Sequence, residues 1–312
     1  MTRTPGIPGR RTPSNRPAIR LGDVLRAGAT IPPHPAAEDY LAQLTGWQML
    51  GNDRAGNCVA VTWANMRRLV TRFLAAETYP TQAQVWDVYR TQNPQFDPNV
   101  NGPGSAADGG MDIQTLLERL VKVGGPDGVK AVAFAKVDYT NLAEVEAALA
   151  IFGGTWTGVN VLQANMDEFS AGQPWDYVAR SPLDGGHSVL SGGYDAARTR
   201  FITWGAETEF TDAFRRHQFE EDWIVIWPEH LGTQQFEAGI DRAALAAAYQ
   251  ELTGNTLPLP PAPPSPTPPS PVPADADTAF AAVLRHWVTE RHVGENHRVQ
   301  LAAEAWLAAK AL

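Results

Sequence analysis

The sequence is short of cysteine, of positive charge and of long apolar runs, and each shortage excludes a class of protein. Its 312 residues include one cysteine, Cys58, so neither an internal disulfide framework nor a cysteine-based zinc cluster can form. No run approaches the roughly 20 apolar residues that span a bilayer. The formal net charge is -9, which argues against nucleic acid as a general partner, because phosphate binding needs a basic surface.

Proline sets the two ends of the chain apart from its middle. Residues 1–20 are basic and proline-rich and lack the apolar core of a secretory signal, which predicts a disordered basic arm or an arm that docks on a partner. In residues 256–275 proline takes about every second place, which is typical of a polyproline-II linker. Residues 276–312 predict a helical hairpin broken near Gly294. Two short helices bury little surface alone, so we expect this hairpin to dock on its own core domain, a second copy or a larger assembly.

The remaining residues, 21–255, predict one α+β domain. Apolar periodicity and capping residues indicate helices at 58–76, from Thr81, from Asp112, from Asn141 and at 240–252. Alternating apolar residues indicate strands at 132–137, 154–162, 186–195, 200–205 and 222–227. Helices dominate the first part and strands the second, which suggests helices packed on an antiparallel sheet. Residues 93–110 and 163–184 are expected to be loops, and long loops often carry function.

Cys58 lies where a loop rich in glycine, asparagine and aspartate meets the predicted helix at 58–76. A thiol at the start of a helix is close to the positive end of the helix dipole and to the free N–H groups of the first turn. This position favours the thiolate, which is the nucleophilic form of cysteine. The alternative is a small buried apolar residue, the usual role of a lone cysteine.

A nucleophilic cysteine needs a base, and histidine is the usual one because its pKa lies near neutral pH. Among the seven histidines, His187 fits best, because it opens a predicted strand directly after Gly185 and Gly186. Glycines at that place let a substrate or another chain segment come close. A structural histidine at the start of a strand is the alternative. His217 and His230 each follow a charged residue and are expected to be exposed.

Over about residues 46–230, the sequence resembles the papain-like cysteine peptidases. That family has its cysteine at the start of a central helix with glycine two residues before it, and Gly56 and Cys58 match. An oxyanion-hole amide stands six residues before the family's cysteine, and Asn52 stands there. The family's catalytic histidine opens a strand reading His-Ala-Val-x3-Gly-Tyr, which residues 187–194 match closely. The Leu-Gly-Asn-Asp-Arg opening is similar to that of compact bacterial and phage members.

The sequence departs from the family at the third catalytic member, an asparagine that orients the imidazole. The family motif is Asn-Ser-Trp-Gly, and residues 202–205 read Ile-Thr-Trp-Gly. Direct register places Ile202 at the asparagine, and a one-residue slip places Thr203 there. Isoleucine cannot form a hydrogen bond, whereas the Thr203 hydroxyl can accept one from the imidazole. Asp184 is a rival third member, because it lies close to His187 in the sequence.

The resemblance implies a cysteine peptidase or amidase acting on a peptide-type or acyl substrate. Cys58 would attack the acyl carbon as part of a thiolate–imidazolium pair with His187, and Asn52 with the Cys58 N–H would hold the oxyanion. Trp204 would cover the imidazole, unless it is a plain core residue. The missing asparagine favours an alternative, a papain-fold structural or binding module that has lost activity, for example in a phage particle. Acyl transfer to an amine on the same fold is a third hypothesis.

The sequence implies no cofactor, no metal and no membrane. The histidines are scattered, and no two have ligand spacing on one element. The acidic run at 220–222 is expected to be a solvated turn. Without an apolar span or a signal peptide, the sequence predicts a cytoplasmic or virion-associated protein.

Overall fold

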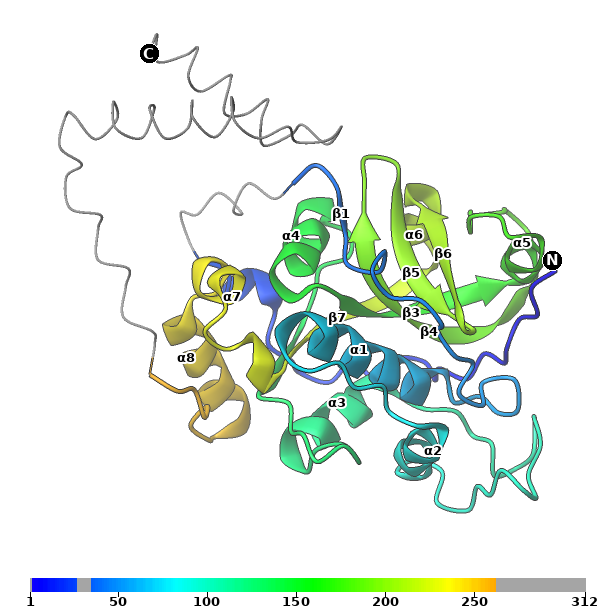
Figure 1. Ribbon diagram of the computed structural model, residues 1–312, viewed down its shortest axis with the longest axis horizontal. Coiled ribbons are helices and arrows are strands. Elements are labelled where there is room, and N and C mark those ends of the chain that lie inside the picture. Colours follow the sequence, from blue (N-terminus) through cyan, green and yellow to red (C-terminus); the bar gives the residue numbers. More distant parts are fainter. Residues whose placement is uncertain (1, 27–34, 262–312) are drawn as a thin grey trace, which may run out of the picture. The chain divides into compact units, whose positions relative to one another are not determined.

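Residues 2–26 and 35–261 are described by a computed structural model of the chain (Figure 1). These residues belong to one unit that ends at Pro261. The predicted hairpin at 276–312 and most of the predicted linker at 256–275 lie outside the described residues, and both stay predictions.

A seven-stranded antiparallel sheet forms the centre of the described part of the chain. Its strands are β1 (Glu38–Asp39), β2 (Ala133–Lys136), β3 (Thr155–Leu162), β4 (Leu183–Tyr194), β5 (Arg198–Thr203), β6 (Ala206–Thr211) and β7 (Phe219–Ile226). The order along the sheet is β2-β7-β3-β4-β5-β6, and the short β1 pairs with β4. The long strand β4 therefore lies in the interior of the sheet, between β3 and β5.

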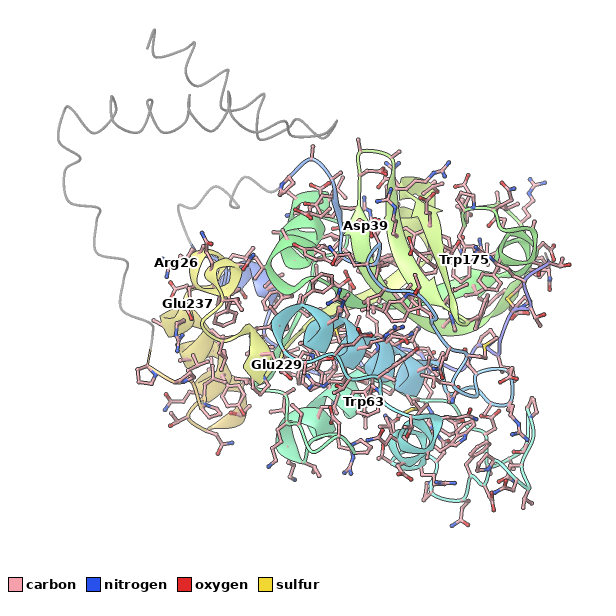
Figure 2. All side chains as sticks on the ribbon, viewed as in Figure 1. Arg26, Asp39, Trp63, Trp175, Glu229 and Glu237 are labelled. Atoms are coloured by element: carbon pink, nitrogen blue, oxygen red, sulfur yellow. The ribbon has the colours of Figure 1, made fainter. Side chains whose placement is uncertain are left out.

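Helices pack on this sheet and around the long helix α1, which confirms the predicted α+β architecture (Figure 1). The helices are α1 (Cys58–Leu74), α2 (Gln82–Arg90), α3 (Ile113–Lys122), α4 (Leu142–Phe152), α5 (Gln163–Ala171), α6 (Asp212–Gln218), α7 (Gln234–Gly239) and α8 (Arg242–Thr253), with 3-10 turns at Leu21–Asp23 and Pro228–His230. Every residue of α1 from Cys58 to Thr71 is buried, and Trp63 at its middle is fully enclosed (Figure 2). Because α1 is buried on all sides, it holds its first residue, Cys58, in a fixed position. None of the helices in the described ranges is long and apolar enough to cross a membrane.

Capping residues start two of the helices as predicted. Thr81 caps α2 in a capping box with Gln84, and Asp112 caps α3 by accepting a hydrogen bond from the Thr115 N–H. These side chains satisfy N–H groups that have no partner within the helix. The start of each helix is therefore encoded within four residues of sequence.

Two local predictions were wrong, and one region had no prediction. The expected loop at 163–184 contains helix α5, and β6 and α6 in residues 206–218 were not predicted at all. The acidic run at 220–222 lies inside β7, where Glu221 and Asp222 are buried. The reason is that partners distant in sequence approach these carboxylates: Arg10 pairs with Glu221, and the Thr157 hydroxyl donates to Asp222.

The N-terminal segment, residues 2–20, lies extended across the domain rather than forming the disordered arm expected from its composition (Figure 1, dark blue). The Arg3 N–H donates to Ser170 O in α5, and further along the segment Ile19 O accepts from the Lys136 N–H of β2. Arg10 and Ile19 are buried. A proline-rich chain suits this extended path, because its few backbone N–H groups bond to the domain instead of to water.

Candidate active site

Cys58 is the first residue of α1 and follows a tight loop. The loop turns at Leu50 and Gly51, whose φ angles of 49° and 85° are both left-handed. Glycine is needed at the second position, since a Cβ there would lie 2.2 Å from the ring of Trp86. Asn57 closes the loop by donating from Nδ2 to Leu50 O at 3.1 Å. The thiol is thereby fixed at the helix N-terminus, as predicted, with 1% of the residue exposed.

His187 and Thr203 meet on the neighbouring strands β4 and β5. His187 Nε2 and Thr203 Oγ1 are 2.6 Å apart, which is a short hydrogen bond. Successive side chains of a strand point to opposite faces, so only one of residues 202 and 203 can face the imidazole. Ile202 packs into the apolar core formed with α1, and the one-residue slip to Thr203 is the register that the strands adopt.

One small cavity brings together all four residues predicted for the site. Asn52, Cys58, His187 and Thr203 line it, and its volume is about 10 Å³, room for about one water molecule. His187 Nδ1 is buried and has no hydrogen-bond partner among the described residues. The rival third member, Asp184, is exposed at the start of β4 and does not line the cavity.

Two tryptophan side chains, Trp204 and Trp175, pack near the imidazole of His187. The ring centroids of Trp204 and His187 are 4.7 Å apart, and Trp175 lies 5.5 Å from Trp204 and 6.4 Å from His187. Trp204 and Gly205 have φ angles of 47° and 70°, so they form the tight two-residue turn between β5 and β6. Trp204 covers the imidazole, as expected from the sequence. Trp175, labelled in Figure 2, was missed because it stood alone in a predicted loop.

Asn52 already uses its amide as a hydrogen-bond donor. Its Nδ2 donates to Ala55 O at 3.0 Å and to Ile7 O at 2.8 Å. The second acceptor belongs to the N-terminal segment, so a backbone carbonyl of this segment occupies the donor that the resemblance assigns to an oxyanion.

The N-terminal segment covers the thiol. Gly9 packs so closely on the loop before Cys58 that a Cβ at this position would lie 2.0 Å from Gly56 O. Backbone hydrogen bonds hold this part of the segment: the Arg10 N–H donates to Gly186 O, and Gly9 O accepts from the Met111 N–H, both at 2.8 Å. Any substrate must displace this stretch to reach Cys58.

Burial under the segment makes the neutral forms of Cys58 and His187 the stable ones. Loss of solvent raises the pKa of the Cys58 thiol to about 11, and backbone hydrogen bonds from Ser188 and Gly9 offset this only in part. Loss of solvent, assisted by the positive charge of Arg10, lowers the pKa of His187 to about 3. In this covered state, burial therefore opposes the thiolate–imidazolium pair expected from the sequence.

Asp108 ties the long loop at 93–110 to the loop that carries the nucleophile. Its carboxylate accepts from the Gly56 N–H at 3.0 Å and from the hydroxyl of Tyr89. Burial, with the Asp108 contact second, raises the pKa of that tyrosine. The predicted functional loop therefore contacts the site through one side chain, which sequence patterns did not single out.

No protein-family model matches the chain, and no curated protein matches it either. Among solved structures, xylellain, a cysteine protease from Xylella fastidiosa, matches with a TM-score of 0.54 and 15% identity, over 72% of this chain and 98% of that one. Procathepsin B S9 from Trypanosoma congolense matches with a TM-score of 0.49 and 11% identity, over 72% of this chain and 87% of that one. The CMS1MS2 cysteine protease from Carica candamarcensis, in complex with E-64, has a TM-score of 0.44 and 12% identity, over 62% of this chain and 98% of that one. The resemblance seen in the sequence is thus matched by a resemblance in fold.

Proposed function

We propose that this chain, whose fold is that of the papain-like cysteine proteases, is itself a cysteine peptidase or amidase. The observation that carries the proposal is the meeting of Cys58 and His187 at one cavity, with Thr203 bound to the far ring nitrogen of His187. In the tautomer that we propose, His187 Nε2–H donates to Thr203 Oγ1, and Nδ1 is free to accept the thiol proton.

In this mechanism the Cys58 proton passes to His187 Nδ1 as the sulfur bonds to the carbonyl carbon of the substrate. The carbonyl oxygen becomes an oxyanion, held by the Cys58 N–H and the Asn52 amide, and one such donor is worth about 2.7–4 kcal/mol. His187 then protonates the leaving nitrogen as the C–N bond breaks. Water, deprotonated by the same imidazole, cleaves the thioester and releases the acid.

The reaction requires the N-terminal segment to leave the site first. Its departure frees the Asn52 amide from Ile7 O and uncovers the thiol next to Gly9. It also returns water to the two buried groups, which moves both pKa values back toward neutral pH and toward the ion pair.

A second candidate is a papain-fold structural or binding module, for instance within a phage particle. The observation that favours it is the covered state itself, in which thiol and imidazole are both buried and neutral. The two candidates differ in whether opening the site reveals a reactive thiol.

The test uses the fact that Cys58 is the only thiol. Gly9→Val is introduced to displace the segment, and alkylation by iodoacetamide at pH 6 and hydrolysis of a mixed quenched-peptide library are both measured. We expect Cys58 to react faster than free cysteine and peptides to be cut, with both signals lost in Cys58→Ala and strongly reduced in His187→Gln. Hydrolysis that survives Cys58→Ala would sink the catalytic assignment. An opened, folded protein whose thiol reacts no faster than free cysteine would favour the binding module.

A further inference from the structure

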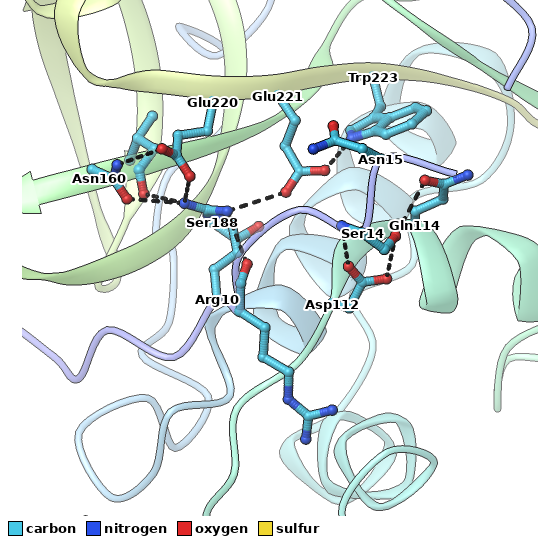
Figure 3. Close-up of polar contacts among 12 residues, drawn as sticks. Arg10, Ser14, Asn15, Asp112, Gln114, Asn160, Ser188, Glu220, Glu221 and Trp223 are labelled. Atoms are coloured by element: carbon cyan, nitrogen blue, oxygen red, sulfur yellow. Dashed lines mark hydrogen bonds and ion pairs between the residues drawn. The ribbon is translucent and has the colours of Figure 1, made fainter. Parts of the chain in front are cut away.

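Arg10 of the N-terminal segment extends its side chain into an acidic pocket beside the site. Its Nη2 lies 3.1 Å from Glu220 Oε2 and 3.1 Å from Asn160 Oδ1, and its Nη1 lies 3.3 Å from Glu221 Oε1 (Figure 3). The side chain of Arg10 is 1% exposed. A guanidinium from a peripheral segment is thus fully enclosed by the domain.

The sheet builds this pocket without help from Arg10. Asn160 on β3 donates from Nδ2 to Glu220 Oε1 at 2.7 Å, and Trp223 on β7 donates from Nε1 to Glu221 Oε2 at 2.8 Å. Each carboxylate therefore has one oxygen held by the domain and the other turned toward the pocket. Such support from neighbouring side chains preorganises a binding site before its ligand arrives.

The pocket has the width of an unbranched aliphatic stem. Gly158 forms one wall, where a Cβ would lie 2.8 Å from Arg10 Cδ and 2.6 Å from Glu221 Cγ. Any side chain at residue 158 would fill the space that the stem of Arg10 occupies. The end of the pocket offers acceptors from two carboxylates, an amide and Val159 O to the Nη1 and Nη2 of Arg10, whereas its buried Nε has no partner among the described residues. Two terminal nitrogens suit this spread of acceptors better than the single ammonium of lysine.

The pocket opens directly onto the catalytic pair. The Arg10 N–H donates to the carbonyl oxygen of Gly186, the residue before His187, and Gly9 lies against the loop before Cys58. A chain that lies across the thiol therefore places the side chain next to the thiol in this pocket. The buried carboxylate of Glu221 is costly without a cation, so the empty pocket attracts one.

We propose that Glu220, Glu221 and Asn160 form a specificity pocket that selects peptides with arginine beside the bond that is cut, and that Arg10 fills it until such a peptide replaces the segment. This inference rests on the proposed peptidase activity. It assigns to the site a substrate class, peptides with a guanidinium side chain, and assigns to Gly158 the role of keeping the pocket open.

The experiment uses the full chain with Arg10→Ala, which empties the pocket, and Gly9→Val, which displaces the segment from Cys58. Alanine heptapeptides carry one arginine at each position in turn, and the matched peptides carry citrulline, which has nearly the same shape and no charge. We expect the best arginine peptide to exceed its citrulline match in kcat/KM by more than about tenfold, the size of a charge-assisted hydrogen bond. Adding Glu221→Gln should remove this preference. An equal rate for the two peptides, or a preference that survives Glu221→Gln, would overturn the pocket.

Binding of the same peptides to a chain with Cys58→Ala and Arg10→Ala separates this inference from the proposed function. Selective binding without turnover in the active chain would contradict the proposed peptidase and support the arginine pocket. Turnover without selectivity would support the peptidase and contradict the pocket. If Glu221→Gln does not fold, Gly158→Val serves instead, because it blocks the pocket sterically. Methylguanidinium chloride at about 10 mM should raise the Tm of Arg10→Ala, and not that of the chain with Gly158→Val added, with sodium chloride as the control.

Discussion

Two arginines of this protein are buried against pairs of carboxylates, and they differ in what carries them. Arg67 stands in the middle of α1, with Nε 2.7 Å from Asp127 and Nη2 2.7 Å from Glu229, and it lies over the ring of Trp227. Arg10 stands on the extended N-terminal segment. The chemistry of the two contacts is nearly the same.

The difference lies in the route by which each arginine could leave its partners. Arg67 can leave only if the central helix unfolds, so its ion pairs are part of the core. Arg10 can leave if a few backbone hydrogen bonds of its segment break, among them the one from its own N–H to Gly186 O. The ion pairs of Arg67 are thus a permanent part of the core, whereas those of Arg10 can break when the N-terminal segment detaches.

The largest expected effect on stability comes from removing the ion pairs of Arg67. Arg67→Met leaves Asp127 and Glu229 without their cation, and loss of one partner of a buried pair typically costs about 3–5 kcal/mol. Arg10→Met should lower the free energy of unfolding by less than about 2 kcal/mol, because its carboxylates regain water when the segment detaches. Urea unfolding measures both. Equal losses would show that the two regions do not differ.

Next in size is the release of the segment by Gly9→Val. The added side chain meets Gly56 O, where even a Cβ would lie at 2.0 Å. We expect the rate of Cys58 alkylation by iodoacetamide at pH 7 to rise more than about tenfold, because the thiol becomes accessible by a local opening. Gly102→Val is the matched control, since a Cβ there meets nothing within 4 Å. A similar rise in both variants would contradict a local effect.

Within the opened site, Thr203→Val should lower kcat/KM by about tenfold, the value of one hydrogen bond of about 1.4 kcal/mol. The free energy of unfolding should change little, because Thr203 positions the imidazole and the valine is similar in size. Thr203→Ser should restore the rate, and the acidic limb of the pH profile should shift in Thr203→Val alone. A rate that stays the same in both variants would remove Thr203 from the catalytic group.

The last expected effect is a pH dependence of the free energy of unfolding that differs between two buried histidines. His230 is buried, contrary to the expectation of an exposed side chain, and burial lowers its pKa to about 4, while that of His187 falls to about 3. The unfolded chain binds protons at these groups below about pH 6.5 and the folded chain does not, so stability falls as pH drops from 6.5 toward 4, by about 1.4 kcal/mol per pH unit for each group.

Replacing each histidine by glutamine should flatten this slope, as followed by urea unfolding from pH 4 to 7. In the Gly9→Val background, His187 is hydrated and titrates near its ordinary pKa, so His187→Gln should no longer matter. His230→Gln should flatten the slope in both backgrounds, because the N-terminal segment takes no part in the hydrogen bonds of His230. Its imidazole donates to Phe152 O and accepts from the Trp227 N–H within the core. If His187→Gln and His230→Gln flattened the slope equally in the Gly9→Val background, the N-terminal segment would not be a releasable cover of the site.

Local signals were enough to predict helices α1, α2, α3, α4 and α8, but not α5, α6 or α7. Thr81 and Asp112 cap their helices through bonds within three residues, and Cys58 precedes a run with helical periodicity. The choice between Ile202 and Thr203 was also within reach, because an apolar residue of a strand faces the core and its neighbour faces away.

What the sequence could not predict depends on contacts between residues far apart in the chain. Glu221 lies 211 residues from Arg10, and without that partner an acidic run is most simply interpreted as solvated. The N-terminal segment has the composition of a free arm, and its backbone partners are distant in the sequence: Asn52, Met111, Lys136, Ser170 and Gly186. β7 also begins at Phe219, three residues before the start that its apolar residues indicated.

The anchoring of the N-terminal segment at Ser170 and at Lys136 has a consequence for how much substrate the protein would need. Because Arg10 is covalently attached between these two anchors, it competes for the pocket at an effective concentration of about millimolar. A free peptide of the same intrinsic affinity would have to reach that concentration to displace half of the segments. If the proposed function holds, we expect no turnover of dilute peptides and turnover of concentrated ones, and a cut anywhere between Arg3 and Arg10 should lower that threshold.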